Sequence, residues 1–284
     1  MPATMDSELK EALSGEMTPK FLATADAAGE PNIVPVISIE PWDSETLIFG
    51  DLMLRKTKAN LTHNAPVSVG VMTPDGKSWS VRGRFQGFER TGPKFDKVSG
   101  HDMYRYNSYS GLRAAGIIAI EETSPPKKID IPNLAAGAIW VTFRRGVGAV
   151  ALSDDGPMPR QVVEKFARMK AAKFMSWLDE EGFPAAASCM SLFPVGPGQL
   201  AVAANELAPV VSNPAFLRGP VSLPGGVPPA GTRVAAAIIT FDPVAYQVKG
   251  VISKYKDYLG TKVARIDVDE VYAASPPLPG HRIA

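Results

Sequence analysis

The sequence predicts a mostly β protein of the α+β class, built from two tandem units with short flanking helices. Three observations lead to this prediction. Short apolar runs alternate with turns throughout the chain, and 25 Gly and 26 Pro residues among 284 supply those turns. The order of the predicted elements in the first half returns from Arg160 onward, which indicates a weak internal repeat. Each unit also ends beside a Pro-Pro pair, at 125–126 and at 276–277.

The composition limits the classes of function. Hydrophobic residues make up 45% of the chain and charged residues 21%, which is typical of a globular protein. A formal charge of +1 provides no field that would steer the protein to nucleic acid or a membrane surface, so we expect neither as a partner. No leader and no apolar run near 18 residues is evident, and we expect a cytoplasmic protein.

The single cysteine, Cys189, excludes an internal disulfide and any multi-cysteine metal site. It lies in an apolar stretch and is expected to be a small core residue. His101 and His281 have no partners at metal-ligand spacing, so we predict no metal site.

The first unit starts with a short amphipathic helix over 6–16, with Asp6 or Ser7 as its cap. A strand over 20–26 and a returning strand over 32–39 flank a turn. Pro35 indicates that the returning strand lies at an edge, contains a bulge, or meets something other than a neighbouring strand. The remaining elements are a strand over 45–49, a helix after it, a hairpin of 67–73 with 78–89, a helix over 95–106 and a strand over 115–122.

A basic segment follows the third strand. The chain turns at Gly50 and Asp51 and then places Arg55, Lys56 and Thr57 at the start of a helix. Backbone N–H groups and the helix dipole favour an anion at such a position, so the segment suits a phosphate group. The alternative interpretation is a solvated basic helix start without a ligand.

The domain boundaries follow from the repeat. We predict one unit over 1–126, a linker over 127–157 with a hairpin of 138–143 and 147–152, and a second, diverged unit over 158–284. The second unit is expected to have a helix over 162–173 and then a strand over 174–178. At the position of the basic segment it carries 207–212, which contains no cation.

The first unit resembles the pyridoxamine 5'-phosphate oxidase-like, FMN-binding split-barrel superfamily. The matching segments occur in the family's order over about residues 20–90, and the second unit resembles a diverged copy of the same barrel. They are Phe21-Leu-Ala-Thr-Ala-Asp26, Gly29-Glu-Pro-Asn-Ile-Val-Pro-Val36, Leu47-Ile-Phe-Gly-Asp51, Lys56-Thr-Lys-Ala-Asn-Leu61, Asn64-Ala-Pro-Val-Ser-Val69 and Val81-Arg-Gly-Arg-Phe-Gln-Gly87.

This resemblance implies two six-stranded antiparallel split barrels with FMN between two barrels. The barrels would pair within one chain, in a homodimer, or in both ways, and the degenerate second unit suggests one flavin per chain. The family's phosphate contacts carry over to Arg55, Lys56 and Thr57, beside the turn at Gly50 and Asp51. Its flavin-ring contacts carry over to the backbone of Val34, Pro35, Val36 and Ile37. Arg82 is a further flavin or substrate contact, or else a charge on the solvent face.

The expected function is that of a flavin-dependent oxidoreductase, in which the flavin carries the redox chemistry. A small-molecule redox substrate is implied, with NAD(P)H as an electron donor, and the substrate's identity is not readable. No catalytic dyad or triad stands out. Two alternatives are a non-enzymatic flavin carrier or redox sensor, and a protein that binds deazaflavin F420 or haem instead of FMN.

The aromatic cluster Tyr104-Arg-Tyr-Asn-Ser-Tyr109 either lines the flavin pocket or packs one barrel on the other.

Overall fold

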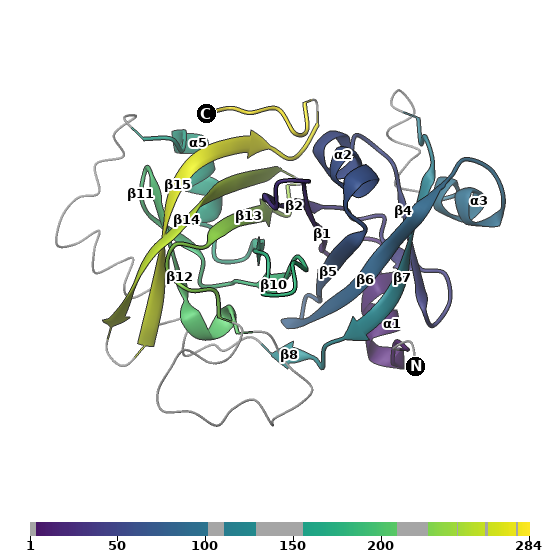
Figure 1. Cartoon of the computed structure of the whole chain (residues 1–284), viewed down its shortest axis with the longest axis horizontal. Coiled ribbons are helices and arrows are strands. Elements are labelled where there is room, and N and C mark those ends of the chain that lie inside the picture. The colour runs from purple at the N-terminus through teal and green to yellow at the C-terminus, as the bar shows by residue number, and fades with distance from the viewer. Residues whose placement is uncertain are drawn as a thin grey trace.

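The protein consists of two curled antiparallel sheets that pack side by side (Figure 1). The computed structural model describes residues 4–101, 111–128, 156–208, 227–242, 244–258, 261–276 and 278–284. The first half lies on the right of Figure 1 and the second on the left, with β1, β2 and β13 between them. Within these described ranges, no helix is both long and apolar enough to cross a bilayer.

The first half contains three helices and eight strands among its described residues. They are α1 (Ser7–Ser14), β1 (Lys20–Ala25), β2 (Pro31–Pro35), β3 (Glu40–Pro41), β4 (Thr46–Gly50), α2 (Arg55–His63), β5 (Pro66–Met72), β6 (Lys77–Glu89), α3 (Pro93–Ser99), β7 (Ala115–Thr123) and β8 (Lys127–Lys128). Asp6 caps α1 as expected, because its side chain accepts a hydrogen bond from the Leu9 amide at 2.7 Å.

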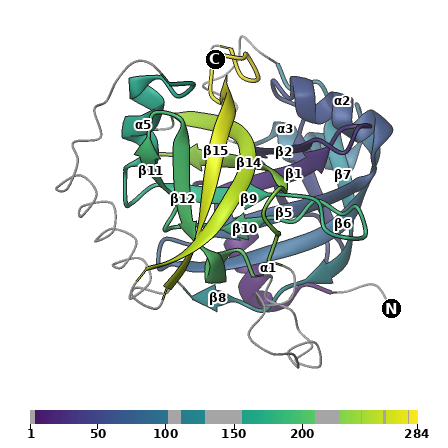
Figure 2. The ribbon, with the colours of Figure 1, turned by 60° about the vertical axis from the view of Figure 1, so that its left-hand side comes forward.

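The second half is poorer in helix. Its described elements are α5 (Arg160–Phe166), β9 (Ala172–Ser176), β10 (Ala187–Ser188), β11 (Phe193–Gly196), β12 (Gln199–Ala203), the 3-10 turn η2 (Ala204–Glu206), β13 (Arg233–Ile239), β14 (Ala245–Tyr258) and β15 (Thr261–Ala273). The long strands β14 and β15 curl across the front of this half in Figure 2.

The two sheets have the same topology, which confirms the predicted repeat. The first sheet runs β2-β1-β5-β6-β7-β4-β3, and the second runs β10-β9-β13-β14-β15-β12-β11. Strand register therefore pairs positions between the halves. Arg82 faces Glu122 across β6 and β7, as Lys249 faces Glu270 across β14 and β15. We call positions related in this way equivalent.

Local hydrogen bonds repeat as well. The Asp26 carboxylate accepts bonds from two amides of the turn after β1, and Asp179 does the same after β9. Ser38 accepts a bond from the amide of Gly50, the last residue of β4, and Ser191 accepts one from Ala203, the last residue of β12. These matches show that the turn similarity in the sequence reflects the same backbone structure.

Three expectations need correction. Each sheet path has seven strands rather than six, because the short strands β3 and β11 pair with β4 and β12; β8 adds a further strand that pairs with β6. The helix expected over 162–173 ends at Phe166, and Lys173 belongs to β9 instead. Pairing of β9 with β13 overrides the helical periodicity of that segment. The helix expected over 95–106 begins at Pro93 and ends at Ser99.

Each sheet encloses its own core, and a third core joins the two. Cys189 is fully buried in the second core, as expected, and burial raises the pKa of its thiol. The shared core contains Phe21, Ile33, Phe174, Ala235 and their neighbours. The predicted hairpin of 138–152 and the cluster of 104–109 lie outside the described residues.

Candidate functional site

The start of α2 lies at the junction of the two halves (Figure 1). The chain leaves β4 through a tight loop in which Met53 has a φ of 59°, a conformation that is uncommon outside glycine. Leu54 occupies the N-cap and supplies no side-chain hydrogen bond to the helix. The first-turn N–H groups of a helix have no partner within the helix, so this end can accept an anion.

The cations of this segment differ in how they are neutralised. Lys58 forms an ion pair with Asp51, whose side chain is 1% exposed. Within the described ranges, neither Arg55 nor Lys56 forms an ion pair with a carboxylate. Arg55 is exposed and Lys56 is half-buried. Among the residues that the structure describes, the two cations assigned to phosphate are therefore the ones without a carboxylate partner, and Asp51 serves to hold Lys58.

Lys56 contacts the second half directly. Its ammonium nitrogen lies 3.6 Å from the centroid of the Tyr272 ring on β15, a cation–π contact. Burial, together with the nearby charge of Lys249, lowers the pKa of Lys56 to about 8. We name Arg55, Lys56, Thr57, Lys249 and Tyr272 the cationic cluster.

A buried polar network supports the helix from behind. The Asn32 side-chain amide donates to the hydroxyls of Thr24 and Thr57 at 3.1 and 3.2 Å. Asn60 donates to Thr24 at 3.0 Å, and Gln247 of the second half donates to the Asn32 side chain at 3.0 Å. Thr57 is only 2% exposed. The network fixes α2 and couples it to β14.

The predicted ring-contact segment lies at a sheet edge, as Pro35 indicated, since β2 ends the first sheet's path. Val36 points into the first core, and its amide donates to the Lys20 carbonyl at 2.8 Å. The Ile37 carbonyl accepts a bond from the Lys20 ammonium at 3.0 Å. Val34, Pro35 and Ile37 remain partly exposed. The Gly50 amide is bonded to Ser38.

Arg82 is not part of this cluster. It lies on β6, which β1 and β5 separate from β2, and it forms an ion pair with Asp179 in the turn after β9. A carboxylate oxygen of Glu122 is also 3.6 Å from the Arg82 guanidinium. The guanidinium carbon lies 4.8 Å from the centroid of the Phe183 ring. Arg84, by contrast, is half-exposed beside Glu121.

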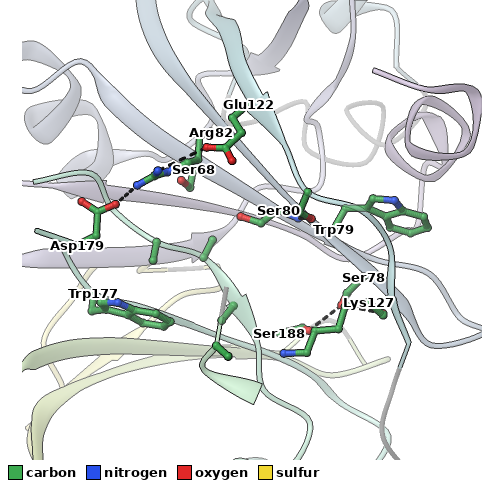
Figure 3. A pocket seen from close by; sticks show the side chains of 15 residues that line it. Ser68, Ser78, Trp79, Ser80, Arg82, Glu122, Lys127, Trp177, Asp179 and Ser188 are labelled. Carbon is green, nitrogen blue, oxygen red and sulfur yellow. Dashed lines mark hydrogen bonds and ion pairs between the residues drawn. The ribbon is translucent and has the colours of Figure 1, made fainter. Parts of the chain in front are cut away.

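A cavity of about 230 Å³ opens where Arg82 lies. Figure 3 shows Arg82, Glu122 and Asp179 at one end, and Ser78, Lys127 and Ser188 at the other. Five serines line it, and we name it the serine cavity: Ser68, Ser78, Ser80, Ser124 and Ser188, with Trp79, Arg82, Glu122, Lys127, Trp177, Asp179, Ala185, Ala186, Ala187 and Ala208.

The repeat relates the serine cavity to the cationic cluster. Arg82 and Glu122 are equivalent to Lys249 and Glu270. Ser80 is equivalent to Gln247, because each lies opposite the same position of the neighbouring strand, Gly70 of β5 or Ala237 of β13. Ser124 follows Glu122 by two residues, as Tyr272 follows Glu270. The side chains at these equivalent positions are therefore smaller in the serine cavity than in the cationic cluster.

We did not predict from the sequence that Lys249, Gln247 and Tyr272 belong to the site. A signal for them existed in the repeat, because Val81-Arg-Gly83 corresponds to Val248-Lys-Gly250. In both segments the glycine sits at a bulge, where a Cβ atom would lie 2.3 or 2.2 Å from a carbonyl oxygen of the neighbouring strand.

The chemistry of the cationic cluster suits a phosphate ester. It offers a guanidinium and an ammonium that have no carboxylate partner in the described part of the chain, an uncapped helix start and a threonine hydroxyl. No group of three or more His, Cys, Asp or Glu side chains that could hold a metal ion occurs in the part of the chain that the structure describes.

The sequence matches no protein-family model and no curated protein. Among solved structures, an FMN-binding protein from Syntrophomonas wolfei is 20% identical to this chain, with a TM-score of 0.38. The match covers 44% of this chain and 90% of the chain of that protein.

Two further structures are similar. A protein related to general stress protein 26, of the pyridoxinephosphate oxidase family, from Clostridium acetobutylicum is 13% identical, with 44% of this chain and 94% of its own covered and a TM-score of 0.34. An F420 reductase is 21% identical, with 40% and 94% covered and a TM-score of 0.33. The solved structures similar to this chain include FMN-binding and pyridoxinephosphate-oxidase-family proteins, and each of them covers less than half of its length. By its own sheet topology, the chain is a tandem of two split β-barrels.

Proposed function

We propose that this protein binds FMN at the cationic cluster and acts as a flavin-dependent oxidoreductase. One observation carries the proposal: within the described ranges, Arg55 and Lys56 stand at the start of α2 without a carboxylate partner, while the adjacent Lys58 is paired with Asp51. An unpaired, half-buried ammonium is unfavourable, and its lowered pKa reflects that cost. A phosphate in contact with it would relieve the cost.

The phosphate end of FMN would meet three groups of the chain. Arg55 and Lys56 would donate charge-assisted hydrogen bonds, and Thr57 would contribute its hydroxyl. The Thr57 oxygen already accepts a bond from Asn32, which leaves its O–H free to donate to a phosphate oxygen. The uncapped first turn of α2 adds the positive end of the helix dipole.

The ring end of FMN would lie along the partly exposed residues of β2 and the segment after it, which include Val34, Pro35 and Ile37. Bound flavin supplies the redox chemistry, and the protein's part is to bind it, orient it and keep water out. The second half contributes from the other side, with Tyr272 beside Lys56. We infer one flavin per chain, because the second half has no cation at the position equivalent to Arg55. Ser38 and Ser191 are equivalent, and Ala208 follows Ser191 at the same distance in sequence as Arg55 follows Ser38.

Binding is tested with FMN and riboflavin, which differ only in the phosphate. The purified protein is freed of cofactor and titrated with each by fluorescence quenching. We expect FMN to bind at least a hundredfold more tightly than riboflavin, and the triple variant Arg55→Ala, Lys56→Ala and Thr57→Ala to remove this preference. Lys10→Ala, on exposed α1, serves as the control for lost charge. Equal affinity of the two flavins for the unaltered protein would overturn the phosphate assignment.

Turnover is tested separately on the FMN-loaded protein. NAD(P)H should reduce the bound flavin, and an added acceptor should reoxidise it, at rates above about 1 s⁻¹. Reduction and reoxidation many orders of magnitude slower would indicate a flavin carrier or redox sensor instead. The absorption spectrum of the protein as purified identifies the group that it carries, since FMN, deazaflavin F420 and haem absorb differently.

A further inference from the structure

The serine cavity differs from the cationic cluster in its charge. Arg82 is neutralised by Asp179 and Glu122, and its guanidinium lies over the Phe183 ring. Lys127 donates to the Glu206 carbonyl at 2.8 Å, and thereby spans from the first half to the second. The four charged side chains of the lining are two cations and two carboxylates, so the cavity offers no excess charge to a phosphate.

The walls of the cavity combine apolar surface with hydroxyl groups. Ala185, Ala186, Ala187 and Trp177 belong to the apolar part of the lining. Ser78 and Ser188 approach to 2.7 Å and are hydrogen-bonded across the two halves. Such walls suit a ligand with an apolar body and few polar atoms.

Among the described residues, two buried polar groups of the lining have no hydrogen-bond partner, the Ser68 hydroxyl and the Trp79 indole nitrogen. Ser68 is fully buried, and its Oγ makes no hydrogen bond. It lies on β5, where its neighbours Val67 and Val69 point into the first core and Ser68 therefore faces the second half. Figure 3 shows it beside Arg82. A buried hydroxyl without a partner is costly, so a ligand that supplies the missing hydrogen bond is favoured there.

The size of the cavity limits the ligand further. Pockets for drug-sized ligands occupy about 300–1,000 Å³, and this cavity is smaller, at about 230 Å³. A dinucleotide or a whole flavin would not fit in it, whereas a compound with a single ring would.

We propose that the serine cavity is a second binding site, which takes an uncharged, single-ring organic compound with one or two hydrogen-bonding oxygen or nitrogen atoms. The Ser68 hydroxyl bonds to a polar atom of this compound, and the alanine and tryptophan walls hold its ring. The site is separate from the cationic cluster and does not depend on the flavin proposal.

The test compares benzamide with benzoate, which have the same shape and differ in charge. Both are titrated into the full-length protein by isothermal titration calorimetry. We expect saturable binding of one benzamide per chain and at least tenfold weaker binding of benzoate. Ser68→Ala should weaken benzamide binding roughly three- to tenfold, as expected for one neutral hydrogen bond. Ser176→Ala is the matched control, because Ser176 is also fully buried with an unpartnered hydroxyl but does not line the cavity.

A second variant fills the cavity with the side chain found at the equivalent position. Ser80→Gln introduces the residue type of Gln247 and should abolish benzamide binding. If this variant lost its cooperative melting transition, the comparison of Ser68→Ala with Ser176→Ala would still decide. The proposal is overturned if benzamide shows no saturable binding, if benzoate binds as tightly, or if Ser68→Ala and Ser176→Ala have the same effect.

Discussion

Phe21 and Phe174 occupy equivalent positions in the two sheets and stack on each other, with their ring centroids 4.6 Å apart. Gly70 makes this contact possible, because a Cβ atom there would lie 2.3 Å from the Phe174 ring. The equivalent position of the second half holds Ala237. The junction of the halves is therefore built on near symmetry, with one glycine that admits the ring from the other side.

Gly70→Ala should destabilise the protein by about 1–3 kcal/mol, since the added methyl group overpacks a buried aromatic contact. The free energy of unfolding in urea measures the effect. Phe174→Leu removes the ring that the methyl group meets, so Gly70→Ala should cost much less in that background. Equal costs in both backgrounds would show that the ring is not the cause.

The preference for FMN over riboflavin should decrease as pH rises from 7 to 9.5. Burial lowers the pKa of Lys56 to about 8, so the free protein loses this cation above that pH. The phosphate monoester of FMN is fully charged over this range, because its second pKa is about 6. We expect a loss of roughly tenfold in relative affinity, measured by titration at each pH.

Lys56→Arg provides the control for this pH dependence. Guanidinium keeps its charge over the whole range, so the variant should show a nearly constant preference for FMN. A decrease of the same size in the variant would assign the titration to another group.

Arg82→Ala should leave FMN affinity within twofold of the unaltered protein, whereas Lys56→Ala should lower it at least tenfold. The reason is position, since Arg82 pairs with Asp179 beside the serine cavity and Lys56 contacts Tyr272. Arg82→Ala should cost about 1 kcal/mol or less in stability, because the pair is partly exposed. Comparable losses of FMN affinity in the two variants would place Arg82 in the flavin site, as the sequence suggested.

Lys20 should make the stability of the protein rise with pH. Its side chain is 2% exposed, and burial lowers its pKa from 10.5 to about 8. Between these values the unfolded chain holds the proton more tightly than the folded one, so stability increases with pH across this window. Below about pH 8 both states are protonated, and the full cost of burying the charge remains.

Urea unfolding at pH 7.5 and pH 9.5 measures this effect. Relative to Lys20→Met, which does not titrate, the unaltered protein should gain about 1–2 kcal/mol between the two pH values. Lys173 has the equivalent position and also a lowered pKa, so the comparison is made with Lys173 present in both proteins. Parallel pH profiles of the two proteins would contradict the assignment to Lys20.

Much of the fold follows from local signals. The hairpin of β5 and β6, the turn capped by Asp26 and its counterpart at Asp179 are readable from alternation and turn residues. The end of α5 could not be predicted, because Ala172 and Lys173 continue the expected helical segment and only pairing with β13 makes them part of a strand. The short strands β3 and β11 contain too few residues to show any period.

The sequence by itself determined that the chain is a duplicated β protein and that its one basic helix start lies in the first half, because turn residues, alternation and charge are local properties. Only the tertiary structure decided which side chains of the second half face that helix, namely Lys249, Gln247 and Tyr272, and that Arg82 faces the serine cavity instead. The physical reason is that strand register and the packing of two sheets join residues distant in sequence, and the side chains at equivalent positions then differ between the two junctions.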